Sequence, residues 1–378
     1  MGIGAAGSMI GELMVISRGS CLVIDQQIWG VLHFFANSSP IACIMSLSSS
    51  SAPKSSSPVM ARFNELVSYQ SQHANNGIPR SVMEYLAANQ VFPIVAPPGL
   101  VGRNALAPLR GWPGLCITVA QCTPNQGPVS HNHTGTLETF FCLDGEFDVL
   151  WGNDLQHKVT LQPGDLCSVP PNVYRAFRNL TGQEARLLVL IQGDDKMSDK
   201  IEMLRAIGEG IRQEHGDQVM DLLAGINMRF QGEPAHNISM QGMQSRIARS
   251  QSLTPHTVGR ETHYPVMGST TSHAAPVTCW PGMEVSMLKL SPNESTTAGV
   301  DDDHSQWVIQ IGDPSCEVTI DGNPIALQRY DLVRVEPGSS RTIRNTSDRT
   351  CQVLLVTQSR ETISAAMIEA IKSAPSHH

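Results

Sequence analysis

Two histidines and one glutamate lie close together near the middle of the chain, in the order His131, His133 and Glu138. Residues two apart on an extended strand point to the same side, so both imidazoles face one direction. Glu138 lies five residues after His133, in an apolar and aromatic run (137–143) that predicts the next strand. Two imidazoles and one carboxylate from adjacent strands suit a non-haem Fe(II) ion. The sequence therefore predicts one divalent metal ion, Fe(II) first, with Mn, Ni or Zn as alternatives.

The spacing of these residues resembles the first signature of the cupin superfamily, G-x5-H-x-H-x(3,4)-E-x6-G. His131, His133, Glu138 and Gly145 fit this signature, and Asn125 stands where it has its first glycine. The resemblance implies that the three ligands approach one metal ion inside a β-barrel.

The second cupin signature, G-x5-P-x-G-x2-H-x3-N, follows after a short spacer. Gly164, Pro170 and Asn179 fit it, and Asn172 replaces a glycine, a mild change because both residue types tolerate positive φ. Arg175 stands at the place of the third histidine, and arginine cannot ligate a metal because it keeps its proton. The resemblance therefore implies a metal site with one family ligand missing.

An internal repeat determines the expected architecture. Trp112-Pro-Gly recurs as Trp280-Pro-Gly, and Arg175-x-x-Arg-Asn recurs as Arg341-x-x-Arg-Asn; Val101-Gly-Arg has a partner at Val258. Each copy consists of short β-runs separated by turn residues, which is typical of all-β barrels or sandwiches. Since cupins are double-sheet jelly rolls, the chain resembles a bicupin: an all-β protein of two tandem cupin jelly-roll barrels with a few flanking and linking helices.

The repeat divides the chain into four expected regions. These are a leader, disordered or preceding the true start (1–57), an N-terminal barrel with the metal ligands (58–196), a helical linker (197–250) and a degenerate C-terminal barrel with a final helix (251–378). The leader also admits a weak targeting peptide or a functional segment. Apolar periodicity predicts helices at 81–88, 199–215, from 219 onward after a break at Gly216, and at 362–372.

The second copy has lost the metal-ligand set. Counting from the Trp-Pro-Gly marker, the ligand positions hold Gly299, Asp301 and Gln306. The acidic run 301–304 is interpreted as a solvated loop, with a displaced metal site as the alternative, because adjacent aspartates repel unless hydrated or cation-bound. We expect this barrel to support the first barrel or a dimer interface.

Arg175 has two interpretations. Facing inward, it would hold a carboxylate or enolate of the substrate in bidentate fashion, which makes it the catalytic candidate. Alternatively, because Arg341 persists in the copy without metal ligands, the arginine bonds carbonyls at the barrel rim and has no chemical role.

Composition limits the partners. The net charge of −8 argues against a nucleic-acid binder. Nine cysteines without CxxC pairs indicate free thiols in a reducing, cytoplasmic compartment. The apolar stretch 22–45 contains Asp25 and is a poor membrane span. A small-molecule substrate is the expected partner. The family resemblance also implies that the chain can form a homodimer.

Three classes of function remain open. The first, which we favour, is a metal-dependent, dioxygenase-like oxidoreductase of a small oxygen-chelating substrate, as in the quercetin, gentisate and β-diketone dioxygenases that the motif weakly resembles. The second is a metal-assisted isomerase, decarboxylase or lyase. The third is a non-catalytic bicupin that binds a small ligand.

Overall fold

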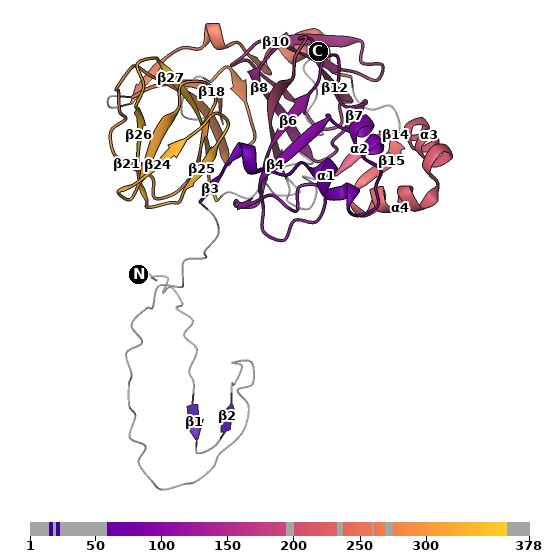
Figure 1. Ribbon diagram of the computed structural model, residues 1–378, viewed down its shortest axis with the longest axis horizontal. Coiled ribbons are helices and arrows are strands. Elements are labelled where there is room, and N and C mark those ends of the chain that lie inside the picture. Colours follow the sequence, from indigo (N-terminus) through magenta and orange to yellow (C-terminus); the bar gives the residue numbers. More distant parts are fainter. Residues whose placement is uncertain are drawn as a thin grey trace, which may run out of the picture. The chain divides into compact units, whose positions relative to one another are not determined.

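A computed structural model describes residues 15–17, 20–22, 59–193, 200–232, 237–258, 261–268 and 275–360 (Figure 1). The chain divides into two compact units, residues 1–55 and 56–378. In the first unit, β1 (Val15–Ser17) pairs with β2 (Ser20–Leu22) in antiparallel fashion. Both barrels belong to the second unit. The helix predicted at 362–372 and most of the segment predicted as a leader lie outside the described residues.

The first barrel consists of two sheets. One has the strand order β16-β11-β8-β13-β6-β4-β5 and the other the order β10-β9-β12-β7-β14-β15. The strands of the first are β4 (Gln90–Ala96), β5 (Leu109–Arg110), β6 (Leu115–Cys122), β8 (Thr136–Asp144), β11 (Leu166–Val169), β13 (Ala185–Gly193) and β16 (Ile247–Ala248). Those of the second are β7 (His131–Asn132), β9 (Phe147–Trp151), β10 (His157–Leu161), β12 (Arg175–Asn179), β14 (Ile201–Leu204) and β15 (Met228–Gly232).

The second barrel repeats this plan. One sheet has the order β17-β18-β20-β27-β22-β25-β3, with β19 beside β18, and the other the order β21-β26-β23-β24. The strands of the first are β3 (Met60–Ala61), β17 (His256–Val258), β18 (Glu261–Gly268), β19 (Val277–Thr278), β20 (Met283–Leu290), β22 (Ser305–Gln310), β25 (Leu332–Val335) and β27 (Cys351–Gln358). Those of the second are β21 (Gly299–Val300), β23 (Cys316–Ile320), β24 (Asn323–Leu327) and β26 (Ser340–Asn345). The predicted all-β, two-barrel architecture is confirmed.

A continuous apolar run explains how the barrels pack. In β13, Leu187 and Val189 belong to the interior of the first barrel, whereas Leu188 and Leu190 belong to a second cluster. That cluster also contains Trp307 and Val356 of the second barrel. Strand β13 is therefore buried on both faces, which requires hydrophobic residues at consecutive positions instead of alternate ones.

The helices lie on and beside the first barrel. Their bounds are η1 (Phe63–Glu65), α1 (Tyr69–Ala74), α2 (Arg80–Leu86), α3 (Arg205–His215), α4 (Asp217–Gly225), α5 (Met240–Gln244) and η2 (Ser250–Ser252). Helices α3 and α4 lie on the side of the first barrel away from the second barrel (Figure 1). No helix in the described part of the chain combines the length and the apolar character needed to cross a membrane.

The predicted helix 199–215 is wrong in its first part. Residues 201–204 form strand β14, and the helix begins at Arg205. Glu202 and Met203 pair with Asn132 and His131, so the edge of β7 takes up these backbone groups. Burial alternates along β14, a period of two that competes with the helical period in the same residues. The predicted break at Gly216 is confirmed, with φ of 81°.

In each barrel, one edge strand comes from the segment that precedes the other barrel in the sequence. Strand β3 pairs with β25, and β16 pairs with β11. Behind β3, Arg62 Nη1 lies 2.6 Å from Asp331 Oδ2, and the backbone N–H of Phe63 donates to Asp331 Oδ1 at 2.9 Å. Behind β16, Arg249 Nη1 lies 2.7 Å from Asp165 Oδ2. We call residues 60–66 and 247–253 the exchanged arms.

Two equivalent glutamines also connect the barrels. The Nε2 group of Gln192 donates to the Trp280 carbonyl at 2.8 Å, and that of Gln358 donates to the Trp112 carbonyl at 2.9 Å. The Trp-Pro-Gly markers of the sequence are therefore the points at which each barrel receives a buried side chain of the other.

Candidate metal centre

Neighbouring strands place two of the three predicted ligands, and the third, His133, directly follows the strand of His131. His131 lies in β7, between Arg175 of β12 and Met203 of β14. Glu138 lies in β8, opposite Val169 and Ile191. Gly127 lets the segment before β7 approach β12 closely, since a Cβ there would lie 1.7 Å from the Phe177 carbonyl oxygen. The short strand that carries His131 is thus fixed on both edges and at its entry.

Positive-φ turns explain two departures from the family pattern. Asn125 stands where the first signature has glycine and has φ of 59°. Asn172 replaces the glycine of the second signature and has φ of 60°. Asparagine enters the left-handed region more readily than other non-glycine residues. Both substitutions preserve the turn that the motif requires, as predicted for Asn172.

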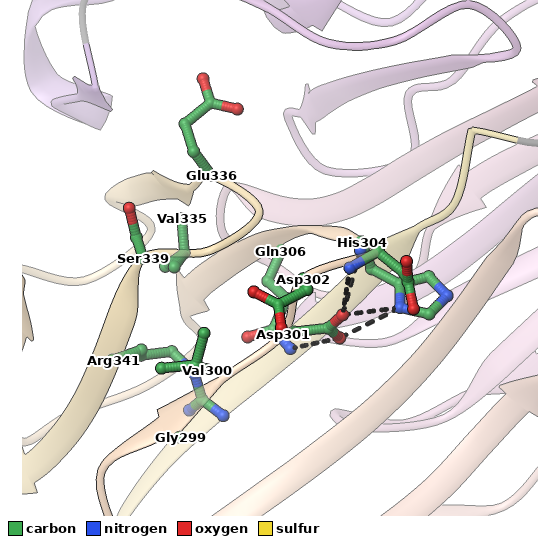
Figure 2. Close-up of a pocket in the computed structure, with 11 residues that line it drawn as sticks. Gly299, Val300, Asp301, Asp302, His304, Gln306, Val335, Glu336, Ser339 and Arg341 are labelled. Carbon is green, nitrogen blue, oxygen red and sulfur yellow. Dashed lines mark hydrogen bonds and ion pairs between the residues drawn. The ribbon is translucent and has the colours of Figure 1, made fainter.

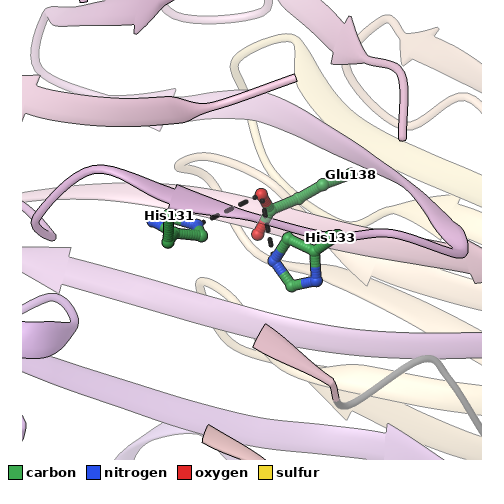
Figure 3. Close-up of side chains that lie close together, drawn as sticks. All are labelled: His131, His133 and Glu138. Carbon is green, nitrogen blue, oxygen red and sulfur yellow. Dashed lines mark ion pairs between the residues drawn. The ribbon is translucent and has the colours of Figure 1, made fainter. Parts of the chain in front are cut away.

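His131, His133 and Glu138 converge on one point (Figure 3). Glu138 Oε2 lies 3.5 Å from Nε2 of His131 and 3.5 Å from Nε2 of His133. All three side chains are buried. Two ligand atoms that each lie ~2.1 Å from one ion are about 3.0–3.4 Å apart. The spacing fits a single divalent ion with small adjustment.

Hydrogen bonds and burial prepare the donor atoms for a cation. The Nδ1 group of His131 donates to the Val129 carbonyl at 2.9 Å, which leaves Nε2 as the lone-pair donor. Burial lowers the pKa of His133 to about 4, so that ring is neutral at neutral pH. Burial opposes ionisation of Glu138, yet the neighbouring His133 and His131 hold its pKa well below the usual range.

Unsatisfied buried atoms point to the same conclusion. Within the described residues, three buried atoms of this set have no hydrogen-bond partner of ordinary geometry. They are the two ring nitrogens of His133 and Oε2 of Glu138. Buried polar atoms normally have partners, and exceptions call for an explanation such as an ion. The donor set therefore fits a divalent metal ion, whose identity the geometry leaves undetermined.

Arg175 lies inside the barrel next to this set. It is fully buried, its Nε is 3.6 Å from Glu138 Oε2, and its Nη2 donates to the Pro170 carbonyl at 2.8 Å. Burial lowers its pKa to about 10, so it stays charged at neutral pH. It faces Glu138, and it does not line the cavity beside the ligands.

A small cavity of about 50 Å³ adjoins the ligands. His131 and Glu138 form part of its wall, and Phe177 adds an apolar face. Residues of α1 and α2 and the loop that follows β4 close it, among them Tyr69, Leu86, Arg103 and Asn104. Substrate access to the ligands is therefore through a covered, narrow space.

The sequence reasoning missed Arg103. This residue is 3% exposed and contributes to the cavity wall. Its signal was present as the repeated Val-Gly-Arg triplet, whose second copy ends at Arg260, outside the described residues. A buried guanidinium in the wall of a cavity is a natural partner for a carboxylate.

The strand register confirms the predicted loss of ligands in the second barrel. Arg341 pairs with Gly299, as Arg175 pairs with His131. Gln306 pairs with Val335, as Glu138 pairs with Val169. Among the described residues, the convergent set of three metal-binding side chains is the one in the first barrel.

Comparison with known proteins agrees with this architecture. Residues 119–191 match the family model of the cupin domain. No curated protein sequence matches the chain. The structure is similar to that of the oxalate decarboxylase formate complex from Lactobacillus farciminis, with a TM-score of 0.51, 12% identity, and coverage of 84% of this chain and 91% of that chain.

A second similar structure is the oxalate decarboxylase of Bacillus subtilis at pH 4.6. Here the TM-score is 0.51 at 13% identity, and the match covers 80% of this chain and 77% of that chain. Identities this low establish the shared fold only. Residues 119–191 are therefore a cupin domain, and the chain has a bicupin fold, in which the same barrel plan is built twice.

Proposed function

We propose that the first barrel binds one divalent metal ion through His131, His133 and Glu138 and is a dioxygenase-like oxidoreductase of a small, oxygen-chelating organic anion. The observation that carries this proposal is the convergence of two imidazoles and one carboxylate, all buried, on one point. This donor set favours Fe(II), with Mn, Ni and Zn as alternatives. A bound ion would supply Lewis-acid polarisation of the substrate oxygens and, as Fe(II), redox chemistry with O2.

The cavity limits the size and charge of the substrate. Its volume of about 50 Å³ has room for roughly three or four water-sized groups, since one water needs at least ~10–15 Å³. Arg103 in its wall offers paired N–H donors to a carboxylate. We therefore propose a small carboxylate, such as a keto acid or dicarboxylate, and not a bulky aromatic molecule.

The two arginines have different roles in this proposal. Arg103 binds the substrate carboxylate directly, because it lines the cavity. Arg175 acts through Glu138: its guanidinium lies 3.6 Å from Oε2 and orients the carboxylate toward the two imidazoles. Arg175 is thus a positioning residue, and the substrate clamp first expected of it belongs to Arg103.

A metal-dependent decarboxylase or other lyase is the second candidate. The similar solved structures are described as oxalate decarboxylases, and one holds formate. A two-carbon dicarboxylate is of the size and charge that the cavity and Arg103 favour. This candidate shares the metal ligands and differs in needing no net consumption of O2.

The compartment is part of the proposal. Seven cysteines in the described residues are free and buried, among them Cys142 and Cys167. Burial raises the pKa of Cys167 to about 12, so this thiol remains protonated at neutral pH. Free thiols support the expected reducing, cytoplasmic location.

The test is elemental analysis of the anaerobically purified full chain beside His131→Ala, with His263→Ala as the matched control in the second barrel. About one metal ion per chain, lost only in His131→Ala, is expected. O2 electrode and CO2 assays with oxalate, pyruvate and glyoxylate then separate the candidates. Metal-dependent O2 uptake supports the oxidoreductase, and CO2 release without O2 uptake supports the lyase. Absence of stoichiometric metal excludes both and leaves non-catalytic ligand binding.

A further inference from the structure

The second barrel has its own cavity at the place where the first barrel has metal ligands. Its volume of about 380 Å³ is within the ~300–1,000 Å³ range of small-molecule sites. Gly299, Asp301 and Gln306 line it at the positions of the three ligands, and Arg341 lines it at the position of Arg175. Position 299 itself faces open space, since a Cβ there would meet nothing within 4 Å.

The charges around this cavity are segregated. Arg341, which is 8% exposed, lies on one side, and the Asp301–His304 pair lies on the other (Figure 2). Asp302 and Asp303 are exposed and also belong to the lining. The cavity thus presents a buried cation at one side and an acidic segment at the other, and a further carboxylate of the lining, Glu336, is already paired with Arg334.

We propose that this cavity binds a small zwitterion, a molecule with one carboxylate and one ammonium group. The guanidinium of Arg341 pairs with the carboxylate through parallel N–H donors. The exposed carboxylates of Asp302 and Asp303 attract the ammonium group. Gln306 and Ser339 also line the cavity and supply amide and hydroxyl groups for further hydrogen bonds.

Ligands of other classes fit less well. A simple anion meets the net acidic charge of the lining, and a bare cation meets Arg341. Asp301 is already engaged: it accepts from the backbone N–H groups of Asp303 and His304 and from the His304 ring. The lining residues include no Trp, Tyr or Phe, so a sugar ring has no aromatic face to stack on.

The test is isothermal titration calorimetry of the full chain with glycine, β-alanine and 4-aminobutyrate, a series of increasing charge separation. Acetate and ethylamine, at equal ionic strength, carry one charge each. We expect one zwitterion of the series to bind saturably and each single-charge analogue to bind at least tenfold more weakly. Binding should survive Glu138→Gln, because the metal centre is in the other barrel.

Two glycine variants give a matched pair. Gly299→Leu fills the cavity, whereas Gly312→Leu adds the same side chain at another open position of this barrel that is not in the lining. Zwitterion binding should be lost in the first variant and retained in the second. Asp302→Asn, at an exposed position, is an independent variant that should weaken binding several-fold without affecting the fold.

Four results would overturn the proposal. One is binding of no zwitterion in the series, and another is equal binding of acetate. The third is saturable binding of CaCl2 that Gly299→Leu abolishes, which would assign the cavity to a cation. The last is zwitterion binding that neither Gly299→Leu nor Asp302→Asn changes, which would place the ligand elsewhere.

Discussion

The two barrels share their strand register and differ in what the strands display. In each, an arginine of one strand pairs with the first residue of a two-residue strand, which is His131 in the first barrel and Gly299 in the second. Three changed side chains separate a convergent metal-ligand set from an open polar cavity. The barrel therefore forms without the metal ligands, and the residues at the ligand positions can differ while the strand register stays the same.

The barrels also differ in their cover. Helices α1 and α2 and the loop with Arg103 close the first cavity, and β14 and β15 extend its sheet past β7. In the second barrel, β21 ends its sheet and Val300 is 58% exposed. The cavity volumes of about 50 and 380 Å³ follow from this cover together with the glycine at position 299.

The strongest test of the contrast removes one histidine from each barrel. His133→Ala should eliminate stoichiometric metal from the first barrel, because the fully buried ring is a central donor. His304→Ala in the second barrel should leave the metal content unchanged. Elemental analysis with circular dichroism as a folding check measures both. Retained metal in a folded His133→Ala protein would contradict the site.

The next prediction concerns a variant that carries the metal-ligand set of the first barrel at the equivalent positions of the second barrel. The triple variant Gly299→His, Asp301→His, Gln306→Glu places the ligand set on the second barrel, where position 299 has open space for a side chain. We expect a second metal ion to bind, more weakly than the first because the second site is open to solvent, with Val300 58% exposed beside position 299. Zn2+ titration counts the sites, with Gly299→Ala, Asp301→Ala, Gln306→Ala as the control. An unchanged stoichiometry would show that ligand identity alone is not sufficient.

Arginine lies at the same position in both barrels, so replacing Arg175 and Arg341 in turn compares the effect of this charge on the two barrels. Arg175→His removes a positive charge 3.6 Å from Glu138 and adds a neutral donor, so metal should bind at least tenfold more tightly, about 1.4 kcal/mol. Arg341→His should have no effect on that affinity. Competition with a chromogenic chelator measures both variants. An unchanged metal affinity in Arg175→His would show that the charge of Arg175 does not affect metal binding.

The exchanged arms predict the most symmetric effects. Asp331 and Asp165 are buried and accept equivalent bonds from the two arms. Asp331→Asn and Asp165→Asn should each lower the free energy of unfolding by about 1–3 kcal/mol, because each leaves a buried bond network incomplete. Urea denaturation of the two variants measures this. A loss at one position only would show that the arms are not equivalent.

Much of the fold was predictable because the repeat and the signature residues act locally. Turn residues such as Asn172 fix the backbone from within the chain, and His133 follows directly on the short strand that carries His131. The ligand positions of the second barrel could be counted from Trp280, since both copies keep the same register.

The remainder depends on contacts between distant segments. Strand β14 forms because β7 has an open edge, which residues 201–204 alone do not reveal. Arg103 enters the cavity wall through a loop whose path is set by tertiary packing. The exchanged arms share Ala-Arg-x-x-x-Leu, at 61–66 and 248–253, but each contains a strand of only two residues, too short for periodicity to detect.

The exchange of arms sets an order for assembly during synthesis. Arg62 and Asp331 are 269 residues apart, so the first arm cannot dock until nearly the whole second barrel has been made. At about 5–20 residues per second, this is a delay of roughly 13–54 s. The second arm has no such delay, because its acceptor in the first barrel is already present. The nascent first barrel therefore gains its edge strand β16 as soon as the linker has been made. The N-terminal arm, with strand β3, docks on the second barrel afterwards.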